Sequence, residues 1–226
     1  MNVLVAGGRG FLGAAIVEAA RAGGHAVTIL SREGGSAGAA PAIGGDVTNR
    51  KSLAGKLGAF DVVVDAVQFP NSPVENPRKG YTFERVDLGG TKNLVEAAKE
   101  QGVRQFVGLS GAGAAEQARF HWLRYKWQEE EAIKASGIGY TIFRPSWVYG
   151  PGDVSLNRFL GLARFLPFVP VIGNGKVRLN PVFVGDVAAH VVASLGNAQA
   201  LDRVFEIGGP EVLTMDDIIR TALRVA

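Results

Sequence analysis

Three glycines at a fixed spacing are the residues of this sequence best suited to bind a phosphate. They stand in Gly7-Gly8-Arg9-Gly10-Phe11-Leu12-Gly13, between a short apolar run and a segment with helical spacing of apolar residues. A dinucleotide-binding turn needs a tight strand exit (Gly7), close approach of backbone to pyrophosphate (Gly10) and close helix packing (Gly13). Backbone N–H groups at the helix start, Phe11 and Leu12 included, would then face the phosphates. A glycine-rich turn without a ligand is the alternative, and the strand-then-helix context disfavours it.

The end of the second apolar run indicates which dinucleotide is bound. An NAD site usually has a carboxylate there, which accepts hydrogen bonds from the ribose. This chain has Ser31 and Arg32 instead. A guanidinium suits the 2′-phosphate of NADP, Arg9 of the glycine turn is placed to assist, and Ser31 adds a hydroxyl donor. The pattern predicts NADP over NAD, although Glu33 next door keeps open that Arg32 is a solvated surface charge.

Two further runs end in a carboxylate beside the expected cofactor. Asp46 and Val47 follow the third run, where a carboxylate can accept the adenine amino group, and Asp65 precedes Ala66 and Val67 at the end of the fourth. We expect Asp46, Val47, Ala66 and Val67 to line the cofactor. Either aspartate could instead cap the segment that follows it, a role for which Asp is well suited.

Apolar runs and helical segments alternate along the first two thirds of the chain. Such alternation predicts parallel βαβ units with right-handed crossovers, and hence an α/β fold with a Rossmann-like, doubly wound parallel sheet. Strands are expected at 3–6, 26–30, 61–66, 105–109 and 140–143, and helices at 11–22, 83–101 and 119–136. Residues 34–41 are too short and too rich in glycine for a crossover helix, so a flexible loop or frayed turn is expected there.

After Pro145 the composition and the pattern of apolar residues change. Pro and Gly become frequent, the apolar stretch 159–171 lacks the earlier alternation, and a helix begins near Met215. We therefore expect a dinucleotide-binding part over residues 1–145 and a small C-terminal substrate lobe over residues 146–226, packed on the first as a single structural unit.

Composition excludes several classes of function. The 226 residues contain no cysteine, so thiolate chemistry and Cys-based metal sites are ruled out, and the three histidines have no ligand spacing, so no metal is expected. A net charge of +3, with no Lys/Arg run, argues against a nucleic-acid partner. The N-terminal run enters the glycine turn without a basic segment before it, and none of the apolar runs reaches membrane-spanning length. We expect a cytoplasmic protein with a small-molecule substrate of unknown identity, free to oligomerise.

Taken together, these stretches resemble the extended and atypical short-chain dehydrogenase/reductases, the epimerase/dehydratase-like group. Within that group the chain is similar to relatives of the nucleotide-binding accessory subunit of respiratory complex I. The resemblance covers nearly the whole chain in order, and it rests on 5–13, 45–47, 93–98, 136–145, 149–153 and 181–187.

The resemblance implies a catalytic serine after the fifth strand and a Tyr-x-x-x-Lys on the next helix. Ser110 and Lys126 occupy the serine and lysine positions, and Lys126 is expected to hold the ribose hydroxyls. Pro145 follows the sixth strand, where the family places the nicotinamide. The tyrosine position, however, is Trp122, and an indole N–H cannot transfer a proton in the useful pH range. Tyr125 lies about 100° around the helix from Lys126, so we interpret it as a surface or interface residue.

Two functions follow from this pattern. The first is an NADPH-dependent oxidoreductase that reduces a small carbonyl or quinone-like substrate, at a cost typically of about 10²- to 10⁴-fold for the lost general acid. The alternative is a non-catalytic protein that holds NADP(H) as a structural or redox-sensing element and acts through a partner. A sugar-nucleotide epimerase is the weakest reading, because it too relies on the absent tyrosine.

Overall fold

The computed structural model describes residues 1–38, 40–154, 156 and 175–225. The strands are β1 (Asn2–Ala6), β2 (Ala26–Ser31), β3 (Gly35–Ala37), β4 (Ala40–Gly44), β5 (Val62–Asp65), β6 (Gln105–Leu109), β7 (Gly139–Pro145), β8 (Val148–Tyr149), β9 (Arg178–Leu179), β10 (Val182–Phe183), β11 (Arg203–Ile207) and β12 (Leu213–Thr214). The α-helices are α1 (Phe11–Ala22), α2 (Gly89–Glu100), α3 (His121–Lys134), α5 (Val184–Ser194) and α6 (Met215–Val225). Short helical turns are η1 (Arg50–Leu53), η2 (Pro77–Lys79), η3 (Phe83–Leu88, of π type) and η4 (Ala198–Ala200).

One sheet organises the molecule. Its strand order is β11-β7-β6-β5-β1-β2-β4-β3, and every neighbouring pair is parallel except β3 with β4. The chain starts in the middle at β1, moves outward through β2 and β4, and then returns to the other side of β1 for β5, β6 and β7. This reversal makes the sheet doubly wound, which confirms the fold class expected from the sequence.

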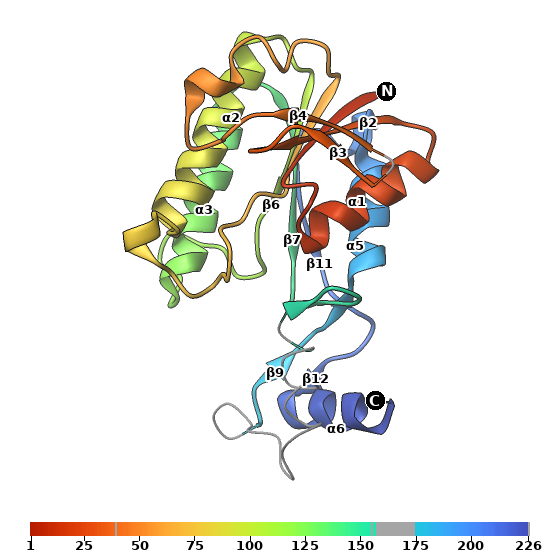
Figure 1. The fold of residues 1–226 in the computed structure, drawn as a ribbon. Coiled ribbons are helices and arrows are strands. Elements are labelled where there is room, and N and C mark those ends of the chain that lie inside the picture. Colours follow the sequence, from red (N-terminus) through yellow and green to blue (C-terminus); the bar gives the residue numbers. More distant parts are fainter. Residues whose placement is uncertain (39, 155, 157–174, 226) are drawn as a thin grey trace.

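Helices cover both faces of the sheet (Figure 1). Helices α2 and α3 lie on one face, and α1 and α5 lie on the other. The alternation of β1 shows why: Val3 and Val5 belong to the core under α1 and α5, whereas Leu4 and Ala6 belong to the core under α2 and α3. A strand that is buried on both sides must be apolar throughout, as the run Val3–Ala6 is.

The segment between β2 and β4 differs in part from expectation. It contains no crossover helix, as expected, but it is not a plain loop. Gly35–Ala37 forms the antiparallel strand β3, with Gly35 opposite Ala42 and Ser36 opposite Pro41. Gly35 and Gly38 have φ values of +102° and +61°, backbone conformations that glycine adopts without strain. Glycines that indicated a frayed turn therefore build a hairpin at the sheet edge.

Residues after 145 are shared between the sheet and a smaller part. β11 pairs with β7 and α5 packs on the sheet face beside α1, whereas β9, β12 and α6 lie below the sheet in Figure 1. The division of the chain at residue 145 stays a prediction. The stretch 159–171 falls outside the described residues. Among the described helices, none is both long enough and apolar enough to cross a membrane.

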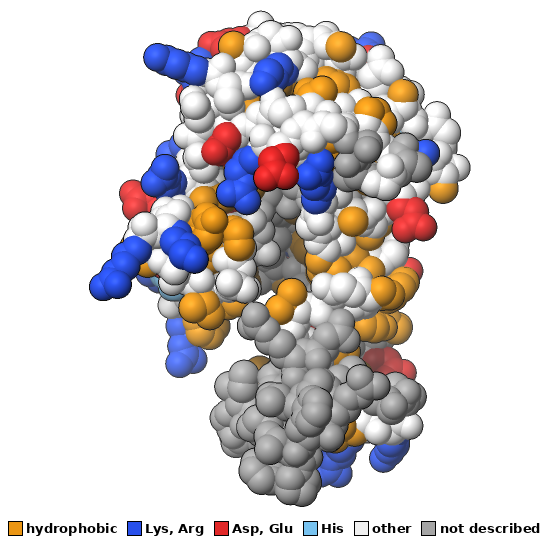
Figure 2. Space-filling model, in the orientation of Figure 1, with side chains coloured by type: hydrophobic (Ala, Val, Ile, Leu, Met, Phe, Trp, Pro, Cys, Tyr) orange, Lys and Arg blue, Asp and Glu red, His pale blue; other side chains and the backbone are white. Residues whose placement is uncertain are grey.

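On the face seen in Figure 2, the Lys and Arg side chains are scattered among acidic and neutral ones. They do not line up into a continuous basic stripe among the described residues of this face, as a nucleic-acid footprint would require.

Candidate functional site

The carboxyl ends of the parallel strands bring the predicted site residues to one edge of the sheet. Ala6 of β1 lies level with Leu30 of β2 and with Asp65 of β5. Asp65 is in turn level with Gly108, two residues before Ser110. The glycine turn, the Ser31–Arg32 segment, Ala66–Val67 and Ser110 therefore leave the sheet side by side. The strand order reverses at β1, and ligands of such sheets bind in the crevice at this point.

The glycine turn is sterically closed to larger residues. Gly7 has φ +77°, and a Cβ there would lie 2.5 Å from the Ala66 oxygen. A Cβ on Gly13 would lie 2.3 Å from the Gly7 oxygen, and the Gly10 N–H donates to that same oxygen at 2.8 Å. Gly10 caps α1, and the Ala14 N–H is the one that closes the first helical hydrogen bond, to the Gly10 oxygen. The N–H groups of Phe11, Leu12 and Gly13 thus precede the helical ladder, where they can meet an anion.

Arginines gather at the end of β2. Arg9 of the glycine turn reaches across to the loop after β2, where its Nη2 donates to the Gly34 oxygen at 3.3 Å. Arg9 and Arg32 are both exposed. Ser31 differs from expectation, because its hydroxyl donates to the Glu33 oxygen and so holds the turn instead of pointing out as a free donor. The Arg9–Gly34 contact fixes one guanidinium against the segment that carries the other.

The two aspartates are engaged in local structure. Asp46 Oδ1 accepts from the Thr48 N–H at 2.9 Å and from the Thr48 hydroxyl at 2.8 Å, so it stabilises the turn before η1. Asp65 is buried, and it accepts from the Thr91 hydroxyl at 2.7 Å and from the Val67 N–H at 3.1 Å. Both aspartates thus have a local role, and contact of Asp46 with adenine stays a prediction. Val47 is buried beside them.

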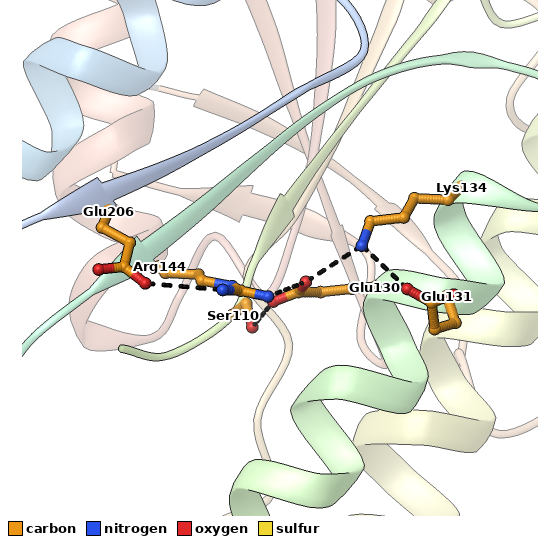
Figure 3. A network of polar contacts seen from close by, with 6 residues as sticks. All are labelled: Ser110, Glu130, Glu131, Lys134, Arg144 and Glu206. Carbon is orange, nitrogen blue, oxygen red and sulfur yellow. Dashed lines mark hydrogen bonds and ion pairs between the residues drawn. The ribbon is translucent and has the colours of Figure 1, made fainter. Parts of the chain in front are cut away.

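Ser110 belongs to an ion-pair network (Figure 3). Its hydroxyl donates to Glu130 Oε1 at 2.5 Å, and Arg144 grips the same carboxylate with two hydrogen bonds of 2.8 Å, from Nε and Nη2. Glu130 is only 1% exposed. Burial alone would raise the pKa of Glu130, but the hydrogen bonds from Arg144 and Ser110, with the charges of Arg144 and Lys134, outweigh it and lower the pKa. Glu130 therefore favours its ionised form, and the Ser110 hydroxyl donates its one hydrogen bond to it.

Lys126 lies at the centre of a second buried group, which we call the Lys126 cluster: Asp65, Asp87, Lys126 and Glu129. Lys126 Nζ is 2.9 Å from Glu129 Oε2 and 3.7 Å from Asp87 Oδ1. Burial works to lower the pKa of Lys126, but the charges of Glu129 and Asp87 prevail and raise it. The ammonium thus keeps its charge at every physiological pH, so it can bind hydroxyl oxygens, but it is a poor proton donor.

The carboxylates of the cluster bind protons more readily than usual. Burial raises the pKa of Asp87 to about 6 against the pull of Lys126, and burial likewise raises the pKa of Glu129 to about 7. Burial also raises the pKa of Asp65, in spite of its two hydrogen bonds. Within the described part of the chain, both oxygens of Asp87 and Oε1 of Glu129 are buried without a hydrogen-bond donor.

Trp122 and Tyr125 face different surroundings. Trp122 packs over the loop after β6, where a Cβ on Gly111 would lie 3.1 Å from the indole ring. Tyr125 belongs to an aromatic group with Phe83 and His121, at ring-centroid distances of 6.3 and 6.4 Å. The side chain of half-buried Tyr125 therefore packs toward η3, whereas the sequence predicted a surface or interface residue. Pro145 is buried, and its carbonyl accepts from the Ala112 N–H at 3.0 Å, which ties β7 to the same loop.

The sequence profile of the NAD(P)H-binding family matches residues 7–158, from the glycine turn to just past β8. The chain belongs to the NAD(P)H-binding family. Curated relatives are consistent with the resemblance to complex I accessory subunits. Subunit 9 of the NADH dehydrogenase 1 alpha subcomplex of Arabidopsis thaliana is 32% identical over 146 residues, which are 64% of this chain and 36% of that protein. The photosystem II assembly factor Ycf39 of Cyanophora paradoxa is 33% identical over 100% of this chain and 69% of its own length.

Solved structures share the fold at lower identity. The UDP-glucose 4-epimerase of Thermus thermophilus, in complex with NAD, superimposes with a TM-score of 0.81 at 24% identity, over 99% of this chain and 83% of that one. UDP-glucuronic acid 4-epimerase of Bacillus cereus reaches a TM-score of 0.83 at 20% identity, over 100% of this chain and 83% of that one. The chain thus shares the fold of these epimerases.

Reasoning from sequence missed the acidic residues of this candidate site. Glu129 and Glu130 are adjacent on α3, yet each is buried in a different network. Their signal is the run Glu129-Glu130-Glu131, of which only Glu131 is exposed. A run of acids on a helix usually marks a solvated face, so the sequence gives no reason to bury two of the three. Asp87 was missed because it lies inside the helix expected at residues 83–101, three residues before Gly90.

A groove of about 750 Å³ lies on the outer side of the glycine turn, next to the hairpin that replaces the crossover helix. Gly8 and Arg9 line one end, and Arg21 and Ala22 line the other. It runs along α1 and includes neither Ser110 nor Lys126, so it meets the carboxyl edge at the glycine turn and not at the Ser110 and Lys126 end.

Proposed function

We propose that this chain binds NADP(H) across the carboxyl edge of β1, β2 and β5, and that it keeps the dinucleotide as a structural or redox-sensing element that acts through a partner. One observation carries the second half of the proposal. The Ser110 hydroxyl donates its hydrogen bond to Glu130, and Trp122 occupies the position at which the resemblance places the general acid. The groups that normally move a proton to the substrate are occupied or replaced.

Cofactor binding is supported by the close packing of the glycine turn. The absence of Cβ atoms at Gly7 and Gly13 lets the β1–α1 turn close on Ala66, which leaves the N–H groups of Phe11, Leu12 and Gly13 at the head of the crevice. A diphosphate fits this donor set, because backbone N–H groups and the helix dipole both favour an anion there. When bound, the dinucleotide would supply a hydride-carrying ring, and Lys126 would hold the adjacent ribose hydroxyls.

Preference for NADP is supported by the two arginines. Arg9 is fixed against the loop after β2 by its bond to Gly34, and Arg32 is exposed in that loop. Two guanidinium groups on adjoining segments suit a phosphate dianion and disfavour a free ribose diol. Glu33 is the only acidic side chain in residues 31–38, and it lies one position past the place where an NAD site carries its carboxylate.

The named relatives point toward action with partners. One is a subunit of a respiratory complex and another is an assembly factor of a photosystem. This chain spans 36% of the first relative and 69% of the second. Action through a partner is therefore proposed for this protein and not inferred from the relatives alone.

A reductase is the second candidate function. Lys126 stays charged at the carboxyl edge, and the Ser110 oxygen keeps its lone pairs. Reduction of a quinone or of an activated double bond demands less of a tyrosine than carbonyl reduction does. The reductase version of the proposal is therefore an NADPH-dependent enzyme acting on a small carbonyl or quinone-like substrate.

Calorimetric titration with NADPH and NADH tests the proposal. We expect NADPH to bind more tightly, and Arg32→Ala to weaken NADPH about 10- to 100-fold while leaving NADH nearly unchanged, because a charge-assisted hydrogen-bond pair is lost. Arg21→Ala is the matched control, since it removes the same charge from the far end of α1. Equal affinity for both dinucleotides, or equal loss in both variants, would contradict the preference for NADP.

Mixing the NADPH complex with a panel of quinones and carbonyls then separates the two candidate functions. The binding proposal expects NADPH to remain unoxidised with every member of the panel. Steady consumption of NADPH with any member would establish the reductase instead.

A further inference from the structure

The Lys126 cluster has more negative than positive groups. Three carboxylates surround a single ammonium: Asp65 from β5, Asp87 from η3, and Glu129 one helical turn after Lys126 on α3. All four residues are buried. If all three acids were ionised, the cluster would hold a net charge of −2 away from water, which is costly.

Hydrogen bonds do not compensate for this excess. Asp65 is fully engaged by Thr91 and Val67. Within the described part of the chain, both oxygens of Asp87 and one of Glu129 lack a hydrogen bond of normal geometry, although the Phe69 backbone and Lys126 pull the pKa of Asp87 down against burial. A buried acceptor without a donor costs free energy, and a proton bound to one of these oxygens removes both the charge and one missing donor.

Glu129 is the acid in direct contact with Lys126, because its Oε2 lies 2.9 Å from Lys126 Nζ while its Oε1 is buried without a partner among the described residues. This contact makes it the group that responds when Lys126 binds another acceptor. Lys126 and Asp87 act on it directly, and Asp65 acts from farther away. On the β6 and β7 side, Ser110 and Arg144 are committed to Glu130 instead. The charged side chains of α2 are exposed, namely Lys92, Glu96, Lys99 and Glu100. The pKa of Glu129, raised to about 7 by burial, agrees with this assignment.

We propose that Glu129 is a positioning residue for Lys126 and that it takes up a proton when a dinucleotide binds, so that affinity is coupled to pH. This inference rests on the proposed binding of NADP(H). In the free protein the Lys126 ammonium donates one hydrogen bond to Glu129. When the dinucleotide binds, its ribose hydroxyls accept hydrogen bonds from Lys126 and its two phosphates lie at the same sheet edge. The charge of Lys126 is then divided between Glu129 and the ligand, so the ionised form of Glu129 is less stabilised. The complex then contains the protein, the dinucleotide and one proton, which Glu129 takes up from solvent. The step is binding alone and changes no carbon bond.

Titration calorimetry from pH 7 to pH 9 tests the coupling, in two buffers with different heats of ionisation. NAD⁺ is titrated beside NADPH, because the 2′-phosphate itself ionises near pH 6 and NAD⁺ lacks it. For wild type we expect affinity to fall about five- to tenfold over this range, which corresponds to a rise of roughly one pH unit in the pKa of the coupled group. The difference between the two buffers should report uptake of a proton.

Glu129→Gln should remove the pH dependence, with less than a twofold change from pH 7 to pH 9, because the amide keeps the size of the side chain and cannot titrate. Glu131→Gln is the matched control: it lies on the same helix, is exposed, and pairs with Lys134. It should behave as wild type.

Two results would overturn the inference while the proposed function stands. One is tight dinucleotide binding with no proton uptake in either buffer, a measurement that needs wild type alone and so does not depend on whether the Gln variant folds. The other is an equal fall in affinity with pH in Glu129→Gln and wild type. Failure of every dinucleotide to bind at every pH would instead overturn the proposed function, and this inference with it.

Discussion

At the scale of single residues, the glycine turn depends on the lack of Cβ atoms at its glycines. A Cβ on Gly13 would overlap the Gly7 oxygen at 2.3 Å, and backbone cannot yield as the end of a side chain can. We therefore expect Gly13→Ala to push α1 away from β1, to destabilise the fold by about 1–3 kcal/mol and to weaken NADPH binding at least about tenfold. Urea unfolding and calorimetry measure the two effects.

Gly102→Ala is the matched control for that change. Gly102 has a left-handed backbone, with φ +77°, which Gly13 in α1 does not have, but a Cβ there would meet nothing within 4 Å. It should lose about 1 kcal/mol of stability and keep its affinity for NADPH. A Gly13 variant that loses no more affinity than this control would show that the turn does not hold the dinucleotide.

Trp122 provides a second prediction at this scale. Trp122→Tyr restores the phenol at the family position, four residues before Lys126. We expect no NADPH oxidation with any carbonyl of the panel, because the Ser110 hydroxyl still donates its hydrogen bond to Glu130. Turnover in the variant, absent in wild type, would show that Trp122 alone blocks the chemistry.

At the scale of elements, Glu130 joins three of them. It lies on α3 and binds Ser110 after β6 and Arg144 on β7, as Figure 3 shows. Arg144→Ala would leave a buried carboxylate without its bidentate partner, so we expect a loss of about 3–5 kcal/mol in the free energy of unfolding, measured with urea. Glu206→Ala removes the exposed pair on the other side of Arg144, at 3.6 Å, and should cost less than about 1 kcal/mol. Similar losses in both variants would mean that Glu130 does not depend on Arg144.

Elements were more predictable than side-chain partners. The runs 105–109 and 11–22 become β6 and α1 with the expected bounds, because strands that are buried on both faces and amphipathic helices leave a local pattern. The hairpin at β3 was missed, since its pairing with β4 depends on contacts across a turn. The burial of Glu129 and Glu130 could not be read from sequence, because it depends on other elements: η3 brings Asp87 to Lys126, the partner of Glu129, and β7 carries Arg144, the partner of Glu130.

At the scale of the whole molecule, the buried acids set the response of stability to pH. Glu129 and Asp87 have raised pKa values in the folded protein, about 7 and about 6, so the folded state binds more protons than the unfolded state above pH 4. This contribution is complete below about pH 4 and is lost as pH rises through 6 and 7. Glu130 acts in the opposite direction, because its lowered pKa costs stability when acid protonates it.

We therefore expect the free energy of unfolding to fall by on the order of 3 kcal/mol between pH 5 and pH 8. Glu129→Gln should flatten this fall and be more stable than wild type at pH 8, whereas Glu131→Gln should follow wild type. Urea unfolding at a series of pH values measures the curves. A wild-type stability that rises from pH 5 to pH 8 would contradict the assignment of protons to the Lys126 cluster.

The position of the dinucleotide is the central claim, and amide hydrogen exchange with and without NADPH tests it most directly. Binding across the carboxyl edge predicts slower exchange at residues 7–14, where the first N–H groups of α1 lie, and at residues 31–34 beside Arg9. Exchange in α6 should not change, because that helix lies away from the sheet edge in Figure 1. Unchanged exchange at residues 7–14 in the presence of saturating NADPH, or protection confined to other segments, would contradict the claim.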